Sequence, residues 1–225
     1  MTVIGEGIVV DRTCMYPGGG GQPADTGEII LATGESLRID AVAKDTEGNH
    51  LHYCPSIIPP DLVGMKCRVR LDRQRRLGLM RYHTALHIFN TVMLRSFDGW
   101  TTGVGIGPAS SHIDFKVENY TDGMRSQLEA QVNEVLSQSL CIKAYYLTEE
   151  EFRQRPEQLR TLDVTPPIEN GRVRVVEVEG FEAQACGGTH VRNTTEVGRL
   201  TIKKVKSKGR NNRRFFVELS DQMTA

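Results

Sequence analysis

Short apolar segments separated by turn-forming residues fill the first third of the chain. They are bounded by glycine, proline and asparagine, and several are rich in valine and isoleucine, which is typical of β-strands. The segments are residues 2–10, 28–31, 36–44, 50–55 and 65–71. Many short strands with turns between them predict a small β-barrel or sandwich that ends near residue 72.

The next stretch has a helical pattern, and we expect the rest of the chain to be organised around it. Asp72 is a suitable N-cap, and the pattern stops before Gly99. The apolar positions fit a helix that is buried on much of its surface. They are Leu79, Met80, Leu86, Phe89, Val92 and Met93.

Strand and helix patterns then alternate to the end of the chain. Helices are predicted from Thr121 and from the capping box Thr148–Glu151, the second one limited by Pro156. Strands are predicted within residues 101–118, 140–147, 172–179, 198–206 and 213–220. We therefore expect an α+β protein: a glycine-rich, β-barrel-like domain over residues 1–72, followed by an antiparallel sheet with helices over residues 73–225.

Two histidine-containing motifs predict a metal site. His83 and His87 are four residues apart, so on a helix their Cβ atoms lie about 5–6 Å from each other on one face. The later motif Cys-Gly-Gly-Thr-His adds Cys186 and His190. Either motif alone is weak, because histidines at this spacing arise by chance and buried histidines are often simply hydrogen-bonded. Together they supply three imidazoles and a thiolate, a tetrahedral ligand set for Zn²⁺.

The role of that zinc stays open at this point. Four protein ligands can close the coordination shell around a structural ion, whereas a catalytic site keeps a position for water or substrate. A catalytic ion would either lower the pKa of a bound water or position and polarise a substrate carbonyl.

Four consecutive glycines, Gly18 to Gly21, stand between Pro17 and Gln22-Pro23. Such a run predicts a loop with several residues at positive φ. The loop is either a flexible turn or a backbone that approaches a ligand closely and presents Gln22 at its end. It is not a phosphate-binding loop, because the Lys-Ser/Thr that would follow is absent.

The formal net charge of zero hides an asymmetry. Residues 66–81 hold seven basic residues and one acid, and residues 199–214 hold eight basic residues and none. A single basic run is usually a solvated face, but two runs that flank the predicted metal site favour a polyanionic partner.

Cysteine usage and apolar run lengths predict the compartment. Five cysteines without a pairing pattern indicate a reducing environment. No apolar run approaches the ~18–20 residues that span a bilayer, and the first residues lack the features of a secretory signal. We therefore expect a cytoplasmic protein.

Three motifs in this order resemble a known family. Tyr-Pro-Gly-Gly-Gly-Gly-Gln-Pro, His-Thr-Ala-Leu-His and Cys-Gly-Gly-Thr-His resemble the editing domain of alanyl-tRNA synthetase. They resemble more closely the free-standing AlaX proteins, in the longer class with a glycine-rich N-terminal domain. The resemblance spans Asp11 to about Leu219. With no aminoacylation module present, it implies a trans-acting, zinc-dependent hydrolase of mischarged alanine tRNA, chiefly Ser-tRNA(Ala), with Gly-tRNA(Ala) as a further candidate.

The resemblance also implies residue roles. It assigns the zinc-ligand positions to His83, His87, Cys186 and His190. Gln22 corresponds to an active-site glutamine that faces the metal, and Thr13 to the position that recognises the serine hydroxyl. The chain departs from many relatives in having four glycines before Gln22 rather than two or three, and Cys14-Met15 where others are more aromatic. Neither departure removes a ligand.

Candidate tRNA contacts come from the second basic run. Arg210 lies where relatives carry a basic, glycine-containing turn, and Lys204 and Lys206 precede it in the same run. We expect all three to bind the tRNA backbone.

Two alternatives remain at this stage. Editing domains that act on Ser-tRNA(Thr) share both histidine motifs, although the glycine-rich segment with Gln22 favours the alanine branch. A zinc-stabilised module without catalytic activity would bind zinc and tRNA but show no turnover.

Overall fold

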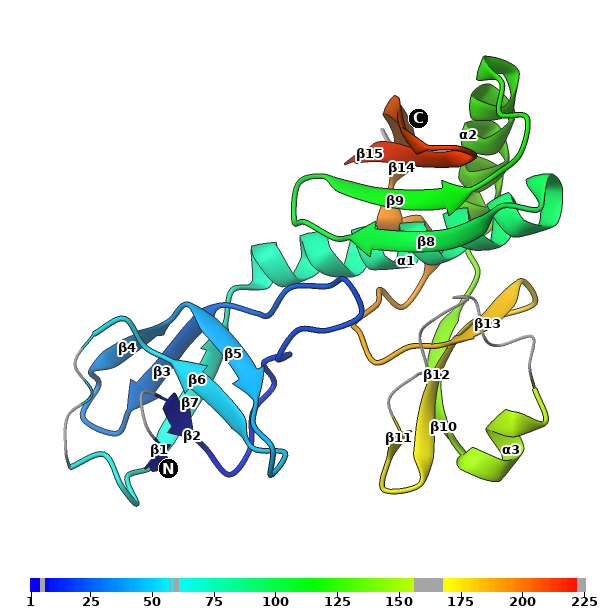
Figure 1. Cartoon of the computed structure of the whole chain (residues 1–225). Helices are drawn as coiled ribbons and strands as arrows, with labels where there is room; N and C mark the ends of the chain where they lie inside the picture. The colour runs from blue at the N-terminus through cyan, green and yellow to red at the C-terminus, as the bar shows by residue number, and fades with distance from the viewer. Residues whose placement is uncertain (5–6, 57, 59–60, 156–167, 222–225) are drawn as a thin grey trace. The chain divides into compact units, whose positions relative to one another are not determined.

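The computed structural model describes residues 1–4, 7–56, 58, 61–155 and 168–221. The chain divides into two compact units, Met1–Leu77 and Gly78–Ala225. Their elements are labelled in Figure 1. Among the described residues, no helix combines the length and apolarity needed to cross a membrane.

The first unit consists of two antiparallel sheets, so of the predicted barrel or sandwich the barrel is not confirmed. One sheet has the order β1 (Thr2–Ile4), β2 (Gly7–Val9), β6 (His50–Tyr53), β5 (Ala41–Lys44), and the other the order β4 (Ser36–Ile39), β3 (Gly27–Leu31), β7 (Cys67–Leu71). Ile8 and Val42 of the first sheet share one buried cluster with Ile29 and Ile39 of the second. No closed barrel is present in the described part of the unit.

The break between the two sheets explains the difference. The predicted single strand 36–44 is divided at Asp40 into β4 and β5, and each half pairs in a different sheet. Hydrophobic alternation reports which face of a strand is buried, but it does not report which strand lies beside it.

Helix α1 (Arg73–Phe97) carries the first histidine motif. It begins where Asp72 caps it, with the Arg75 N–H donating to Asp72 Oδ1 at 3.0 Å. Every residue from Tyr82 to Met93 is buried. This confirms a helix that is covered on most of its surface, which sets His83 and His87 in a protein interior.

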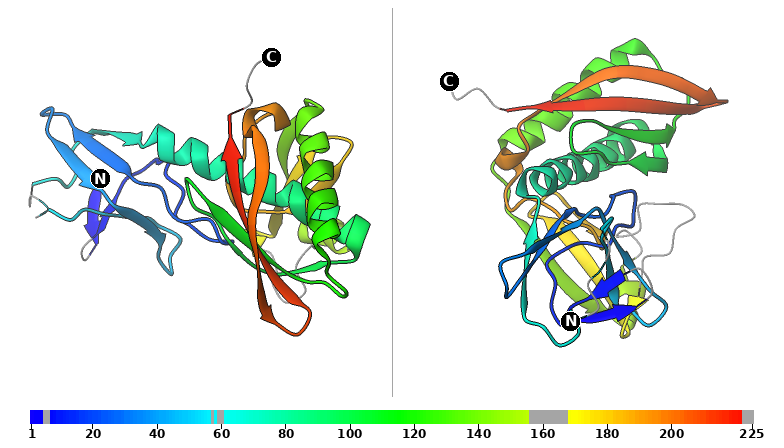
Figure 2. Two further views of the ribbon diagram at one scale, coloured as in Figure 1. Left: turned by 90° about the horizontal axis from the view of Figure 1, so that it is seen from above. Right: turned by 90° about the vertical axis from the view of Figure 1, so that its left-hand side faces the viewer.

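The larger sheet of the second unit has the order β14 (Arg199–Gly209), β15 (Asn212–Ser220), β9 (Ser111–Lys116), β8 (Trp100–Gly105). Helix α2 (Asp122–Ser137) starts at its predicted cap, Thr121. Apolar residues of one sheet face pack with α1 and α2, and Phe89 of α1 lies 5.6 Å from the rings of both Phe115 and Phe215. Figure 2 shows the length of the β14–β15 hairpin in two further views.

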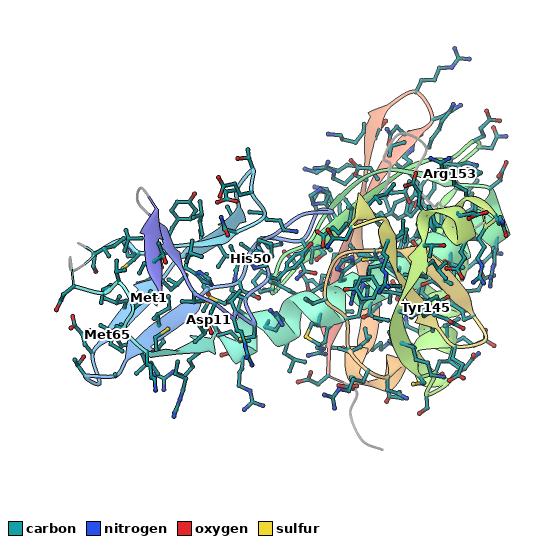
Figure 3. The ribbon with its side chains drawn as sticks, turned by 90° about the horizontal axis from the view of Figure 1, so that it is seen from below. Met1, Asp11, His50, Met65, Tyr145 and Arg153 are labelled. Atoms are coloured by element: carbon teal, nitrogen blue, oxygen red, sulfur yellow. The ribbon has the colours of Figure 1, made fainter. Side chains whose placement is uncertain are left out.

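A second antiparallel sheet positions the second metal-ligand motif. Strand β12 (Arg172–Val178) pairs with β10 (Ile142–Thr148), β11 (Ile168–Glu169) and β13 (Glu182–Ala185). The predicted capping box opens α3 (Glu149–Arg153), while Pro156 lies outside the described residues. Tyr145 of β10, labelled in Figure 3, packs against the small cluster that includes Phe152.

All strand pairs among the described residues are antiparallel, so the expected antiparallel α+β architecture is confirmed. Strand β13 was not predicted. It follows β12 after a short turn and ends at Ala185, directly before Cys186.

Candidate metal centre

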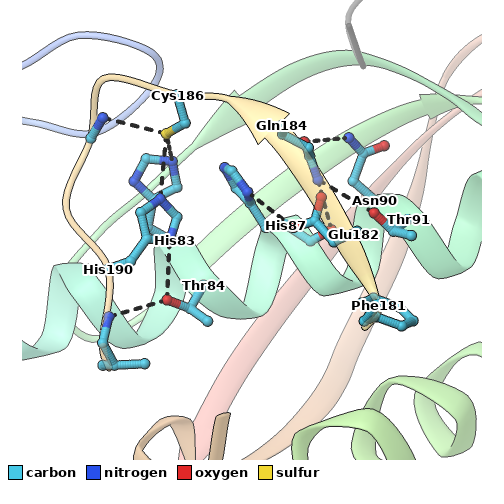
Figure 4. A network of polar contacts seen from close by, with 12 residues as sticks. His83, Thr84, His87, Asn90, Thr91, Phe181, Glu182, Gln184, Cys186 and His190 are labelled. Atoms are coloured by element: carbon cyan, nitrogen blue, oxygen red, sulfur yellow. Dashed lines mark hydrogen bonds and ion pairs between the residues drawn. The ribbon is translucent and has the colours of Figure 1, made fainter. Parts of the chain in front are cut away.

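Four potential metal ligands from two segments of the second unit meet in one place. His83 and His87 come from successive turns of α1, and Cys186 and His190 come from the loop that follows β13 (Figure 4). One ligand atom from each lies within 4.8 Å of all the others. His83 and His87 are only 5% and 9% exposed.

The distances within this cluster fit a tetrahedral ion. Cys186 Sγ lies 3.4 Å from His83 Nε2 and 3.3 Å from His190 Nε2. Zinc–nitrogen and zinc–sulfur bonds of about 2.0–2.3 Å in a tetrahedron hold their donor atoms about 3.3–3.8 Å apart. Three imidazoles and one sulfur at these separations form a donor set that zinc prefers.

The charges in the cluster also favour a cation. Burial alone would raise the pKa of the Cys186 thiol, but His83 and His87 beside it lower that pKa well below its ordinary value. Burial opposes a charge on His87 as well, yet the Cys186 thiolate and the Glu182 carboxylate raise its pKa to about 10. Burial, together with His83 and His87, lowers the pKa of His190 to about 3. A thiolate beside neutral imidazoles is the state that binds metal, and an entering cation would replace the proton on His87.

Arg174 holds the loop that carries the thiolate. Its Nη1 donates to the carbonyl oxygens of Cys186 and Gly188 at 2.7 and 2.9 Å. The Gly188 N–H in turn donates to Cys186 Sγ at 3.3 Å. Sequence analysis did not single out Arg174, because a basic residue within a strand gives no signal of the loop that it supports.

Each of two imidazoles has a partner on the ring nitrogen that points away from the cluster. Thr84 Oγ1 lies 3.1 Å from His190 Nδ1, and Glu182 Oε1 lies 3.4 Å from His87 Nδ1. Metal-binding histidines commonly use their second nitrogen in this way, which fixes the ring orientation and leaves Nε2 for the ion.

Glu182 is a buried carboxylate with no other partner. Its side chain is fully buried, and neither carboxylate oxygen makes a hydrogen bond within the described residues. A buried carboxylate favours a positive charge beside it, and His87, 3.4 Å away, supplies one only while it is protonated. This is a second observation, independent of the four donor atoms, that the centre suits a positive ion. The sequence offered no signal for it.

Buried amides and hydroxyls join β13 to α1 beside the cluster. Gln184 Nε2 donates to the His87 carbonyl oxygen and to Thr91 Oγ1, both at 3.3 Å. Asn90 donates through Nδ2 to Gln184 Oε1 at 3.5 Å, and its Oδ1 accepts from the Thr101 hydroxyl at 2.7 Å. Figure 4 shows the contacts between Gln184, Asn90 and the helix, which fix the strand that leads to Cys186.

In the first unit, the glycine run forms a tight hairpin turn that ends at Gln22. Gly19 and Gln22 exchange two backbone hydrogen bonds of 2.9 and 3.0 Å. Gly20 and Gly21 between them have φ values of 57° and 81°, and a type I′ turn requires positive φ at both of these positions. The prediction of positive φ is confirmed, and Gln22 is only 2% exposed.

Basic residues at the start of α1 bind the segments on either side of this loop. Asp25 accepts the Tyr16 N–H at 2.7 Å and forms a buried ion pair with Arg76. Arg76 also donates to the Cys14 carbonyl oxygen at 2.8 Å, and Arg75 donates to the Ala24 carbonyl oxygen at 3.1 Å. Part of the first basic run therefore supports the glycine loop.

The Thr13 hydroxyl lies 2.8 Å from His52 Nε2 and accepts the Met15 N–H at 3.1 Å. His52 is fully buried, and its Nδ1 lies 2.9 Å from the Ile8 carbonyl oxygen. A carbonyl oxygen only accepts hydrogen bonds, so His52 Nδ1 carries a proton. Burial lowers the pKa of His52, so its Nε2 is unprotonated and accepts a hydrogen bond from the Thr13 hydroxyl. The Thr13 oxygen keeps one lone pair for a further donor. Sequence analysis missed His52.

Comparison with known proteins follows the same segments. The family described as "Threonyl and Alanyl tRNA synthetase second additional domain" matches residues 173–216, which include Cys186 and His190. This part of the second unit is therefore similar to an additional domain of these two synthetases.

Relatives that align with most of this chain identify the family more closely. The chain is 33% identical to the alanyl-tRNA editing protein AlaX-M of Methanosarcina acetivorans, over 95% of this chain and 89% of that protein. It is 34% identical to AlaX-M of Saccharolobus solfataricus, over 94% and 88%. An alanine–tRNA ligase of Korarchaeum cryptofilum is 33% identical over 87% of this chain but only 22% of the ligase. The chain belongs to the AlaX family of editing proteins.

Proposed function

We propose that this protein is a zinc-dependent trans-editing hydrolase that deacylates mischarged alanine tRNA. Ser-tRNA(Ala) is the main substrate and Gly-tRNA(Ala) the second. The observation that carries the proposal is the group of four metal ligands, all within 4.8 Å, in a chain whose relatives are named alanyl-tRNA editing proteins. The same arguments assign the ligands to His83, His87, Cys186 and His190.

The need for such an enzyme follows from the size of the amino acids. A synthetase pocket built for alanine discriminates only about 10–200-fold against glycine or against serine, which adds a single hydroxyl. A second site that binds the serine hydroxyl favours serine over alanine, because bound alanine would leave the polar groups of that site unpaired.

Zinc, when bound, would supply a Lewis acid for the ester carbonyl or a water of lowered pKa. The chain's own residues hold and orient that chemistry. The Cys186 thiolate and neutral His190 present their lone pairs to the ion. Glu182 and Thr84 fix the orientation of the His87 and His190 rings, respectively. Gln22 is proposed to bind the substrate from the rigid end of the glycine turn.

Thr13 is proposed to recognise the serine hydroxyl by accepting a hydrogen bond from it. Its own proton is used toward His52 and one lone pair is used by Met15, which leaves an acceptor and no donor. Serine can donate to this oxygen, whereas alanine and glycine have nothing to donate.

Replacing Thr13 by valine should slow hydrolysis of Ser-tRNA(Ala) by about three- to tenfold. Valine keeps the shape but removes a hydrogen bond of about 0.5–1.5 kcal/mol. Hydrolysis of Gly-tRNA(Ala) should barely change. Single-turnover deacylation of both substrates measures the difference, with Thr13→Ser, which retains the hydroxyl, as the matched control.

An equal loss on serine and glycine substrates would assign Thr13 a supporting role for the loop through His52. A thermal unfolding measurement of Thr13→Val identifies that case, because losing the bond to a buried imidazole also destabilises the first unit.

The tRNA-binding surface is proposed to be the β14–β15 hairpin. Lys204 and Lys206 of β14 and Arg210 of the turn are exposed, and none of them pairs with a carboxylate in the described residues. The first basic run has less positive charge available for phosphate, because Arg70 pairs with Glu28 and Arg76 pairs with Asp25.

Reversing the charge of Lys204, Lys206 and Arg210 together should flatten the salt dependence of tRNA binding. Each lost phosphate contact lowers the slope of log affinity against log salt by ~0.7–0.9. Affinities measured at several salt concentrations give the slope. A double variant of Lys44 and Lys143, lysines outside the hairpin, is the control. An unchanged slope in the triple variant would move the RNA surface elsewhere.

The choice between alanine and threonine tRNA is tested directly by deacylation of Ser-tRNA(Ala) beside Ser-tRNA(Thr). The matched family covers domains of both synthetases, whereas the full-length relatives are named for alanine. We expect Ser-tRNA(Ala) to be hydrolysed faster. Preference for Ser-tRNA(Thr) would support the first alternative, and binding without any turnover would support the non-catalytic module.

A further inference from the structure

The outer face of the β14–β15–β9–β8 sheet carries aromatic groups in a basic setting. Side chains alternate between the faces of a strand, so Phe215 is buried in the core while Arg214 and Phe216 project to the other side. On the next strand, His112 is the register partner of Phe216, with ring centroids 6.0 Å apart. Both rings are partly exposed.

Arg214 is held in a fixed orientation on the same face. Its Nε and Nη2 each donate to one oxygen of Asp114 at 2.7 Å, and Asp114 is buried. Two parallel bonds fix the plane of a guanidinium as well as its position. Arg214, Phe216 and His112 therefore place three planar groups side by side across two strands; we call this set the outer platform.

Glycine keeps the outer platform uncovered on the β8 side. Gly105 is the register partner of His112, and a Cβ at Gly105 would come within 2.3 Å of His112 Cε1. Gly103, two residues before it, is the register partner of Asp114. The imidazole therefore lies across backbone that has no side chain to shield it.

Lysines border the platform on the β14 side. Lys204 is the register partner of Phe216, and Lys206 that of Arg214. Lys206 Nζ lies 5.4 Å from the centroid of the Phe216 ring. Both lysines are exposed, so they can neutralise phosphates beside the rings.

Planar groups within a positive field match the chemistry of unpaired nucleotides. Proteins that bind single-stranded nucleic acid stack bases on aromatic side chains and guanidinium planes and track the backbone with lysine and arginine. An apolar peptide would gain nothing from the surrounding positive charges, and a second copy of this face would be repelled by them.

We propose that the outer platform binds an unpaired nucleotide of the tRNA, with its base stacked on Phe216 and its phosphate beside Lys204 and Lys206. The proposal rests on the proposed function in taking tRNA as the RNA. The base displaces the Lys206 ammonium from the ring, and that ammonium then pairs with the phosphate.

Tryptophan fluorescence can observe this stacking directly. Trp100 is the only native tryptophan, so Phe216→Trp in a Trp100→Phe background gives a probe at the platform. Adding uncharged alanine tRNA should quench the probe in a saturable way, because a stacked base lies against the indole. Tight tRNA binding without any change in the probe's emission would overturn the proposal.

Affinity measurements provide an independent test. Phe216→Leu should weaken binding of uncharged tRNA about fivefold or more, since stacking on one aromatic side chain is worth that much. Phe216→Tyr should stay within about twofold, and Tyr146→Leu, at an exposed aromatic residue of the other sheet, should have no effect. The salt slope of Phe216→Leu should match that of the wild type, because no phosphate contact is removed.

Unaltered affinity of Phe216→Leu, or equal losses in Phe216→Leu and Tyr146→Leu, would contradict the outer platform. These measurements need no hydrolysis. A protein that shows the quenching but leaves Ser-tRNA(Ala) intact would refute the proposed function and retain the platform. A protein that hydrolyses Ser-tRNA(Ala) but shows no quenching would retain the proposed function and refute the platform.

Discussion

Replacing Cys186 by alanine should leave the purified protein almost free of zinc, whereas the wild type should carry about one zinc per chain. The substitution removes the only anionic donor among the four ligands and leaves three imidazoles. Loss of an outer-shell partner alone costs roughly 10–100-fold in metal affinity. Loss of a direct ligand is expected to cost more, and hydrolysis of Ser-tRNA(Ala) should fall below detection with it.

Elemental analysis of matched variants separates this effect from general damage. His83→Ala should lose zinc in the same way as Cys186→Ala. Cys141→Ala and His112→Ala are the controls, since both residues lie in the second unit outside the ligand cluster and are at least partly exposed. Equal zinc content in all five proteins would remove the assignment of the site.

Glu182→Gln should lower zinc affinity by roughly 10–100-fold, the usual cost of losing a carboxylate behind a ligating histidine. The carboxylate lies 3.4 Å from His87 Nδ1, and its side chain is fully buried. Glutamine has nearly the same shape but no charge, so it removes the attraction to the ion and to the His87 N–H. Competition with a chelator at fixed pH measures the change.

The same substitution should also destabilise the metal-free protein. With no ion bound, Glu182 lies 3.4 Å from His87 Nδ1 and helps to raise the pKa of His87 to about 10, so Glu182→Gln leaves protonated His87 without its buried partner and should lower the unfolding temperature near neutral pH. Glu179→Gln, at an exposed residue paired with Lys143, is the control. A variant that loses stability but keeps wild-type zinc affinity would make Glu182 a purely structural residue.

The parts that the sequence predicted are those with local signals. Asp72, Thr121 and Thr148 mark helix starts by cap chemistry that involves neighbouring residues only, and all three are caps in the structure. The two histidine motifs were recognisable because their spacing is short and their side chains are rare.

The parts that it did not predict depend on residues far apart in the chain. Glu182 lies behind His87 only because β13 pairs with β12, and β13 is too short to stand out from the turn before it. Arg76 belongs to the first basic run, which favoured a polyanionic partner, yet it pairs with Asp25, which no sequence pattern connects to it. The barrel is not confirmed for the same reason, since Asp40 divides one apparent strand between two sheets.

The central claim, editing of alanine tRNA at a metal centre, is tested most directly by single-turnover hydrolysis of Ser-tRNA(Ala) and Ala-tRNA(Ala) by one preparation, first metal-loaded and then stripped by chelator. We predict rapid loss of serine and retention of alanine with the loaded protein, no hydrolysis after stripping, and recovery when zinc is restored. Equal hydrolysis of the two substrates, or full activity after the metal is removed, would contradict the account.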